Sequence, residues 1–173
     1  MNLGRVTLGE INRLDREAFT IRLGGLAEDS PWVAYSAWEY RPFATALELV
    51  AGFRGAIARA GEERQIALLE AHPDLAGRAA MAGELTPEST REQAAAGLGA
   101  LGPDDYATFH ERSDAYRARF GYPFVICARE HTSASVLAAF AERLAHDRDE
   151  ELAIALDEVV KIIRLRVADL LAT

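Results

Sequence analysis

The stretch ELAIALDEVVKIIRLRVADLL, residues 151–171, decides the fold class. It contains no glycine or proline, and its apolar side chains recur every three or four residues, which is the spacing of one face of an α-helix. At about 100° per residue these side chains fall into a single apolar stripe, formed by Leu152, Leu156, Val159, Ile163, Val167 and Leu170. We therefore predict a long final helix that buries this stripe against other helices.

Helical signals also fill the rest of the 173-residue chain. Thr7 and Glu10 have the spacing of a capping box at a first helix, and Gly121 is placed to end a helix that begins near Pro103. The apolar run at residues 124–128 has no second strand to pair with, so we predict extended chain or a short helix packed in the core. These patterns, without an internal repeat or linker, predict an all-α fold: a single compact bundle of about seven to nine helices, forming one domain over residues 1–173.

The composition excludes several classes of partner. Half of the residues are hydrophobic, which is enough for a sizeable core, and the formal net charge of −8 disfavours nucleic-acid binding. No run of about 18 apolar residues is present, which argues against a membrane partner. The chain starts without the apolar core of a signal peptide, ends without a peroxisomal tripeptide, and has one cysteine, so no disulfide can form within it. We expect a cytoplasmic protein.

His72 is the first candidate for chemistry. It is expected to end a helix that starts near residue 62, and Pro73 directly after it disfavours the helical conformation at His72. By its spacing alone, His72 is better explained as a helix-end residue that the helix dipole stabilises than as a functional group. The other three histidines, His110, His131 and His146, lie in polar or helical surroundings and are interpreted as surface residues.

A second candidate is a polar cluster at residues 89–93. Thr86 and Ser89 are competing start points for a helix that we predict to run to about residue 101. Ser89, Glu92 and Gln93 would then share one face of that helix. The spacing of Ser89 and Glu92 slightly favours a capping box instead, but a capping box leaves Gln93 unexplained.

Two further residues have competing interpretations. Cys127 lies inside an apolar run with no histidine beside it, so a small buried hydrophobe is favoured over a nucleophile. Arg166 falls inside the apolar stripe of the last helix, where a guanidinium is costly unless an anion meets it. A structural ion pair with Glu158 or another internal acid explains Arg166 as well as an anion-binding role in a pocket does. No set of His, Cys or Glu residues has the spacing of metal ligands, so no metal site is predicted.

Taken together, six segments of the chain resemble one family, the 2-oxo-4-hydroxy-4-carboxy-5-ureidoimidazoline (OHCU) decarboxylases. The segments are SPWVA at residues 30–34, HPDLAG at 72–77, LTPESTREQ at 85–93, AGL at 96–98, YRARFGYPFVI at 116–126, and the last helix with Ile162 and Arg166. They occur in the family's order and span almost the whole chain. The joint match is therefore specific, although each short segment alone is weak.

The resemblance implies an all-helical fold and the last step from urate to (S)-allantoin, performed without a metal or organic cofactor. It implies a homodimer that acts on a small-molecule substrate, with His72 as the catalytic histidine and Glu92 as its acidic partner. This reverses the balance for His72, whose spacing alone favours a structural role. The resemblance also implies a set of residues around the substrate, namely Pro73, Ser89, Gln93, Phe124, Val125, Ile126, Cys127, Ala128 and Arg166.

Two departures from the family's pattern affect the expected substrate preference. The family usually has Leu-Asn three residues before Tyr116, where this chain has Arg112-Ser113. It also tends to have a larger apolar residue at the position of Ala128. Neither change touches His72, Glu92 or Arg166.

Two other functions stay open at this point. The first is a hydrolase of a related ureide or hydantoin, in which His72 and Glu92 would activate water; release of CO2 separates a decarboxylase from it. The second is a non-catalytic helical binding module. Such a module is expected to have lost His72, Glu92 or Arg166, and the chain retains all three.

Overall fold

The computed structural model describes residues 4–77 and 82–172, and within these ranges the fold is all-helical, as predicted. They contain nine α-helices and several short 3₁₀ turns, and the one strand-like pairing among them is an isolated bridge between Val6 and Leu171. No helix in this part of the chain is both long and apolar enough to cross a membrane. Residues 1–3 and 173, on which the expectations about targeting signals partly depend, lie outside the described ranges.

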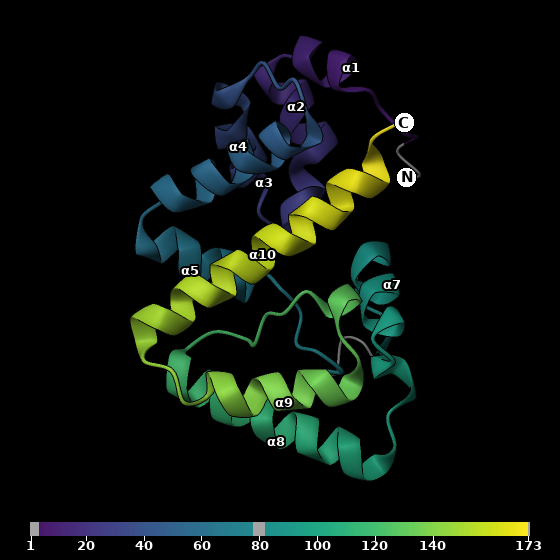
Figure 1. Cartoon of the computed structure of the whole chain (residues 1–173), viewed down its shortest axis with the longest axis vertical. Helices are drawn as coiled ribbons and strands as arrows, with labels where there is room; N and C mark the ends of the chain where they lie inside the picture. The colour runs from purple at the N-terminus through teal and green to yellow at the C-terminus, as the bar shows by residue number, and fades with distance from the viewer. Residues whose placement is uncertain (1–3, 78–81, 173) are drawn as a thin grey trace. The chain divides into compact units, whose positions relative to one another are not determined.

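The chain divides into two compact units, and the first of them joins both ends of the sequence: Met1–Ala71 and Val159–Thr173. Its elements are α1 (Leu8–Arg13), α2 (Arg16–Leu23), α3 (Pro31–Ala37), α4 (Ala46–Arg59), α5 (Glu62–Glu70) and the second half of α10 (Arg148–Leu170). Helix α3 packs against both α2 and α4 (Figure 1), and their apolar faces bury Phe19, Val33 and Phe53. The predicted capping box at Thr7 and Glu10 is confirmed at the start of α1.

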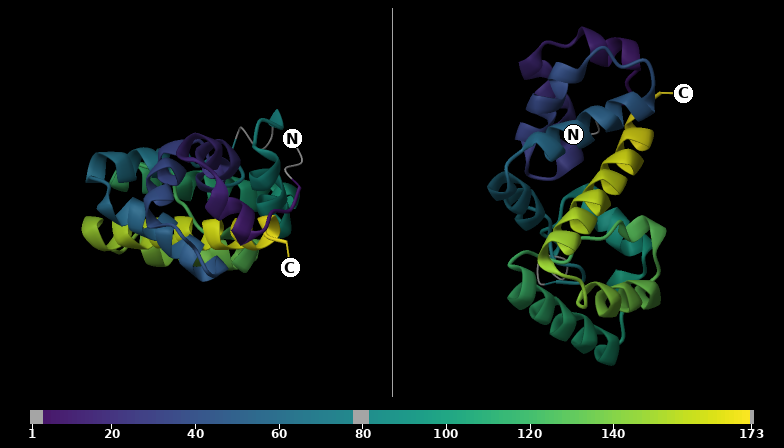
Figure 2. Two further views of the ribbon diagram at one scale, coloured as in Figure 1. Left: turned by 90° about the horizontal axis from the view of Figure 1, so that it is seen from above. Right: turned by 60° about the vertical axis from the view of Figure 1, so that its left-hand side comes forward.

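The second unit is His72–Glu158, and its core is aromatic. It contains α7 (Pro87–Ala95), α8 (Pro103–Phe120), α9 (Ser133–Arg143) and the first half of α10. Helices α8 and α9 pack against each other, as the further views in Figure 2 also show. Between them the rings of Phe124 and Phe140 stack at 3.8 Å, while Phe109 and Tyr116 meet Phe140 edge-on at 6.0 and 6.4 Å.

A glycine separates α8 from the apolar run that follows it. Gly121 adopts a φ of 88°, in the left-handed region that favours glycine, and donates its N–H to the Arg117 carbonyl at 2.8 Å. The chain then runs without helix or strand through residues 123–127 before a 3₁₀ turn, η4 (Ala128–Glu130). Of the two predictions for residues 124–128, non-helical chain in the core describes residues 124–127, whereas Ala128 begins the 3₁₀ turn.

Helix α7 is shorter than predicted and begins at the earlier of its two candidate start points. The Thr86 hydroxyl accepts the Ser89 N–H at 3.2 Å, so Thr86 is the N-cap and Ser89 lies inside the first turn. The prediction that the helix reaches residue 101 is wrong, because Gly97 adopts a left-handed φ of 76° and breaks it after Ala95. The interpretation of Ser89 and Glu92 as a capping box is also wrong, because the N-cap is Thr86 and not Ser89.

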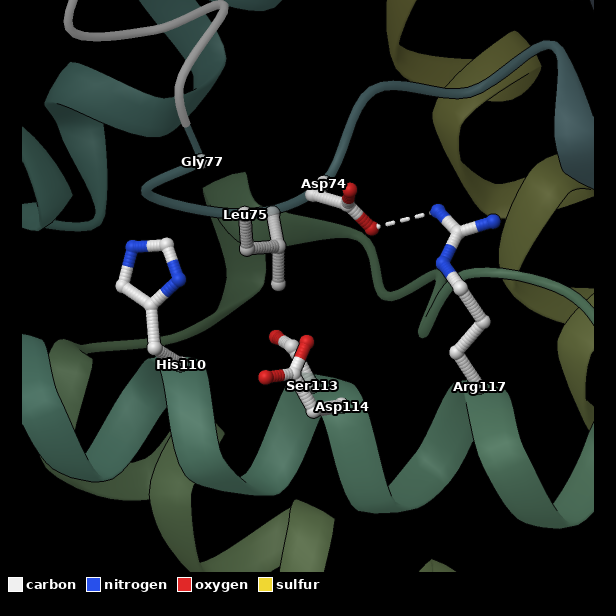
Figure 3. A pocket seen from close by; sticks show the side chains of 7 residues that line it. All are labelled: Asp74, Leu75, Gly77, His110, Ser113, Asp114 and Arg117. Atoms are coloured by element: carbon white, nitrogen blue, oxygen red, sulfur yellow. Dashed lines mark hydrogen bonds and ion pairs between the residues drawn. The ribbon is translucent and has the colours of Figure 1, made fainter.

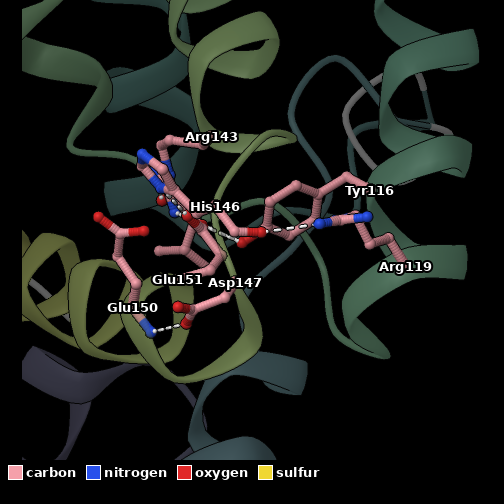
Figure 4. Close-up of polar contacts among 8 residues, drawn as sticks. Tyr116, Arg119, Arg143, His146, Asp147, Glu150 and Glu151 are labelled. Carbon is pink, nitrogen blue, oxygen red and sulfur yellow. Dashed lines mark hydrogen bonds and ion pairs between the residues drawn. The ribbon is translucent and has the colours of Figure 1, made fainter.

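A buried polar network joins α8, α9 and α10 inside the second unit (Figure 4). Glu151 is completely buried, and its carboxylate accepts the Tyr116 hydroxyl and the Arg143 guanidinium, whose Nε lies 2.8 Å away. The Nδ1 atom of His146 lies 2.9 Å from the other oxygen of Glu151. The interpretation of His146 as a surface residue is therefore wrong, because a buried acid holds its imidazole.

Burial raises the pKa of Tyr116 in this network and of Tyr122, whose ring lies 6.0 Å from that of Tyr116. Desolvation, followed by the hydrogen bond to Glu151, raises the pKa of Tyr116 far above its ordinary value of 10.0. Desolvation, followed by the nearby charge of Glu151, raises the pKa of Tyr122 to about 12. The folded protein therefore keeps both hydroxyls protonated at pH values where the unfolded chain ionises them.

These shifts predict a loss of stability in alkali. Above pH 10 the unfolded chain releases protons that the folded chain retains, so the free energy of unfolding falls by about 1.4 kcal/mol per pH unit for each such tyrosine. Urea unfolding of the wild type and of Tyr116→Phe at pH 9, 10 and 11 measures this fall. We expect a shallower fall in the variant, and equal slopes would contradict the account of Tyr116.

Candidate active site

The HPDLAG segment forms a tight turn directly after α5. The helix ends at Glu70, and His72 follows its C-cap residue, as predicted, with only 7% of its surface exposed. Ala76 adopts a positive φ of 50°, and the Gly77 N–H donates to the Asp74 carbonyl at 3.3 Å. A Cβ atom at position 77 would lie 2.9 Å from Cβ of Asp74, so the turn requires glycine there.

Helix α7 is tied to this turn through Gln93. The side-chain Oε1 of Gln93 accepts the Ala76 N–H at 3.0 Å, so this buried amide holds the segment that follows His72. Ser89, on the same face of α7, is also buried, and Glu92 is partly exposed. Ser89, Glu92 and Gln93 therefore share one face of the helix, as predicted. The hydrogen bond to Ala76 also explains Gln93, for which the capping box gave no role.

Residues 124–128 are all buried and lie within the same unit as α7. Their backbone forms hydrogen bonds with two charged side chains, because the segment has no strand partner. Arg143 Nη1 donates to the Val125 carbonyl at 2.7 Å, and the Cys127 N–H donates to Glu158 at 2.8 Å. Cys127 is 1% exposed, in agreement with its interpretation as a small buried hydrophobe. Helix α7 packs against the η4 turn that begins at Ala128.

Arg166 belongs to the first unit and is buried, as its place in the apolar stripe predicted. Its Nη1 atom lies 2.6 Å from the Glu28 carboxylate and 3.2 Å from the Gly25 carbonyl, and both side chains of the ion pair are at most 5% exposed. The partner acid is therefore Glu28. The alternative of another internal acid is therefore right, while a pairing with Glu158 stays a prediction. Glu28 has a φ of 50°, an uncommon backbone conformation for a non-glycine residue.

A cavity of about 180 Å³ opens beside the HPDLAG turn (Figure 3). It is lined by Asp74, Leu75, Gly77, His110, Ser113, Asp114 and Arg117. Asp74 and Arg117 form an ion pair across its edge at 2.8 Å. Ser113, which stands where the family usually has Asn, is part of this lining, so the departure lies next to the turn that carries His72. His110 is partly buried here and is not the surface residue that we predicted.

The second unit holds every predicted site residue except Arg166. Among the described residues, no group of three or more His, Cys, Asp or Glu side chains is arranged to hold a metal ion. Three buried charges were missed by the sequence analysis: Glu28, Arg143 and Glu151. A helical projection of α9 and α10 could have flagged the last two, because each lies on the apolar side of its helix.

Comparison with known proteins decides the family. The family model described as OHCU decarboxylase matches residues 12–168. The chain belongs to the OHCU decarboxylase family. The 2-oxo-4-hydroxy-4-carboxy-5-ureidoimidazoline decarboxylase of Haloferax volcanii is 40% identical over 164 residues, which cover 95% of this chain and 95% of that protein.

Two solved structures share the fold with this member of the OHCU decarboxylase family. A crystal structure of (S)-allantoin synthase matches with a TM-score of 0.78 and 26% identity, over 97% of this chain and 54% of that chain. This chain therefore spans about half the length of that synthase. A crystal structure of OHCU decarboxylase in the presence of (S)-allantoin matches with a TM-score of 0.68 and 27% identity, over 84% of this chain and 94% of that chain.

Proposed function

We propose that this chain decarboxylates OHCU to (S)-allantoin, the last step of urate degradation. The observation that carries the proposal is the match to the OHCU decarboxylase family over residues 12–168, together with 40% identity to a decarboxylase of nearly equal length. The family model runs through both compact units. This supports our proposal that residues 1–173 act as one functional domain.

The chemistry of the substrate explains why no cofactor is needed. Its carboxylate sits on a carbon next to a C=N bond, as in a β-keto acid. When the bond to the carboxylate breaks and CO2 leaves, the electron pair flows into the imine and gives an enol-like intermediate. A proton then adds to one face of the ring and the enol becomes a carbonyl, so the reaction consumes one proton for each CO2 released. We propose that the enzyme uses neither a metal nor an organic cofactor.

Within this reaction His72 is proposed to move the proton. An imidazole titrates near neutrality, and a buried, geometrically fixed histidine can hold a proton over one face of a ring. We propose that His72 engages the substrate hydroxyl and relays a proton as CO2 leaves. Glu92 is proposed to orient His72 and to stabilise its charged form.

The remaining site residues are proposed to bind and orient the substrate. Arg166 suits the carboxylate or a carbonyl, because a guanidinium donates two parallel hydrogen bonds. Ser89 and Gln93 suit the ureido group and ring amides. Pro73 and the segment Phe124, Val125, Ile126, Cys127 and Ala128 are proposed to line the site, in part through backbone groups. We also propose a cytoplasmic homodimer without nucleic-acid or membrane partners.

Carbon balance tests the proposal against a hydrolase. The purified chain is mixed with freshly generated substrate that carries ¹³C in its carboxyl group, and CO2 and organic products are followed by NMR. We expect labelled CO2 to appear faster than in buffer, in a one-to-one ratio with allantoin. Accelerated loss of substrate with the label kept in the organic product would identify a hydrolase. A rate equal to that in buffer would favour a non-catalytic module.

A further inference from the structure

The backbone of residues 124–128 is held by two buried charges from different helices. Arg143 on α9 donates to the Val125 carbonyl at 2.7 Å, and Glu158 on α10 accepts the Cys127 N–H at 2.8 Å. Between these two hydrogen bonds lie the N–H and the carbonyl of Ile126, a residue that is only 5% exposed. Among the described residues, no protein group forms a hydrogen bond with the Ile126 N–H or carbonyl.

Arg143 is itself fixed from several sides. Its Nε and Nη2 atoms lie 2.8 and 2.5 Å from one oxygen of Glu151 (Figure 4). Its guanidinium also stacks over the Phe124 ring at 4.3 Å. The side chains of Arg143 and Glu151 are 6% and 0% exposed. One edge of the guanidinium thus meets the acid while Nη1 points to Val125, so a change in this ion pair would move the segment.

Stability alone is a weak reason for such a network. Buried ion pairs typically add little or nothing over apolar side chains of the same volume, because removing two charges from water is costly. The contact between Arg143 and Val125 also contributes nothing to the neutralisation of Glu151. A positional role accounts for both the burial of the pair and the direction of Nη1.

We propose that Arg143 and Glu158 are positioning residues that fix the peptide groups on either side of Ile126 for contact with the substrate. This inference rests on the proposed function, in which residues 124–128 line the substrate site. In this proposal neither the Arg143 side chain nor the Glu158 side chain contacts the substrate. Their loss is expected to act mainly on substrate binding and on the stereochemistry of the product, and to leave proton transfer at His72 unchanged.

The test compares two variants that disturb the same network. Arg143→Lys keeps a positive charge beside Glu151 but cannot span both Glu151 and Val125. Tyr116→Phe removes the hydroxyl that donates to Glu151 and accepts from Arg143 Nη2 at 3.5 Å, and it leaves the contact between Arg143 Nη1 and Val125 in place. We expect Arg143→Lys to lower kcat/KM about 10-fold to 100-fold, chiefly through KM, and to accelerate amide exchange at Ile126 and Cys127. Tyr116→Phe should leave kcat/KM and the rates of amide exchange within about twofold of wild type, even if its Tm falls by as much as that of Arg143→Lys.

Glu158 offers a second, isosteric pair of variants. Glu158→Gln retains an oxygen that accepts the Cys127 N–H and should keep kcat/KM within about threefold of wild type. Glu158→Met removes that acceptor and should reproduce the rise in KM and the faster exchange at Cys127. Equal kcat/KM in these two variants, or an Arg143→Lys enzyme indistinguishable from Tyr116→Phe, would overturn the proposal.

Amide exchange separates this proposal from the proposed function. If the wild type releases no CO2, the decarboxylase assignment fails. Faster exchange at Ile126 and Cys127 in Arg143→Lys, but not in Tyr116→Phe, would then still support the positioning of the segment. Unchanged exchange in a folded Arg143→Lys protein would refute it whatever the activity.

Discussion

Replacement of His72 by asparagine is expected to lower kcat by about 10²-fold to 10⁴-fold, with a much smaller change in KM. General acid–base catalysis by a positioned side chain contributes a factor of this size, and an amide cannot relay a proton near neutral pH. The side chain of asparagine is smaller than that of histidine, so it fits the buried position of His72 without a clash. Steady-state decarboxylation rates at saturating substrate measure the effect, and a melting curve confirms that the variant is folded.

His131→Asn is the matched control for this experiment. His131 lies in the same unit, and its Nδ1 is 3.1 Å from the Ser135 hydroxyl, so the substitution also removes an imidazole with a hydrogen bond. We expect this control to keep kcat within about twofold of wild type. A His72→Asn enzyme with more than a tenth of the wild-type kcat would contradict proton transfer by His72, while leaving membership of the family intact.

The second large effect is expected at the buried ion pair of Arg166 and Glu28. Arg166→Met should lower the free energy of unfolding by about 3–5 kcal/mol, because it leaves the buried Glu28 carboxylate without the guanidinium that lies 2.6 Å away. The double variant Arg166→Met/Glu28→Gln removes both charges and should recover most of that loss. Urea unfolding of the wild type, the two single variants and the double variant measures the free energy of unfolding for each member of this double-mutant cycle.

Activity of the double variant separates the two interpretations of Arg166. If Arg166 binds the substrate anion, the stable double variant is expected to lose about 10-fold to 200-fold in kcat/KM, the usual value of a hydrogen bond to a charged group. If Arg166 serves only the ion pair, the double variant recovers its activity together with its stability. Recovery of wild-type kcat/KM would therefore remove Arg166 from the proposed substrate site.

Much of the fold follows from local pattern in the sequence. The apolar stripe of the last helix predicts the burial of Arg166, because a helix repeats its faces every 3.6 residues wherever it packs. Pro73 and Gly121 act on their own backbones, so the helix ends beside them are also predictable. The non-helical course of residues 124–127 follows from the isolation of that apolar run.

The buried polar contacts that the sequence did not predict join residues far apart in sequence. Glu28 and Arg166 are 138 residues apart, and Arg143 and Val125 are 18 apart, so no local spacing pairs them. Gln93 finds its partner Ala76 across 17 residues in the same way. The choice between Thr86 and Ser89 as the helix start is local, but both satisfy the capping pattern. The hydrogen bond from the Ser89 N–H to the Thr86 hydroxyl identifies Thr86 as the N-cap.

The handedness of the product tests the central claim most directly. Uncatalysed decay of OHCU gives racemic allantoin, whereas delivery of the proton from one side gives a single enantiomer. Freshly generated substrate is mixed with the purified chain, and circular dichroism is followed through the reaction. The account predicts a signal of (S)-allantoin that grows faster than total allantoin forms in buffer and that disappears in His72→Asn. Allantoin that forms no faster and no more asymmetrically than in buffer would contradict it.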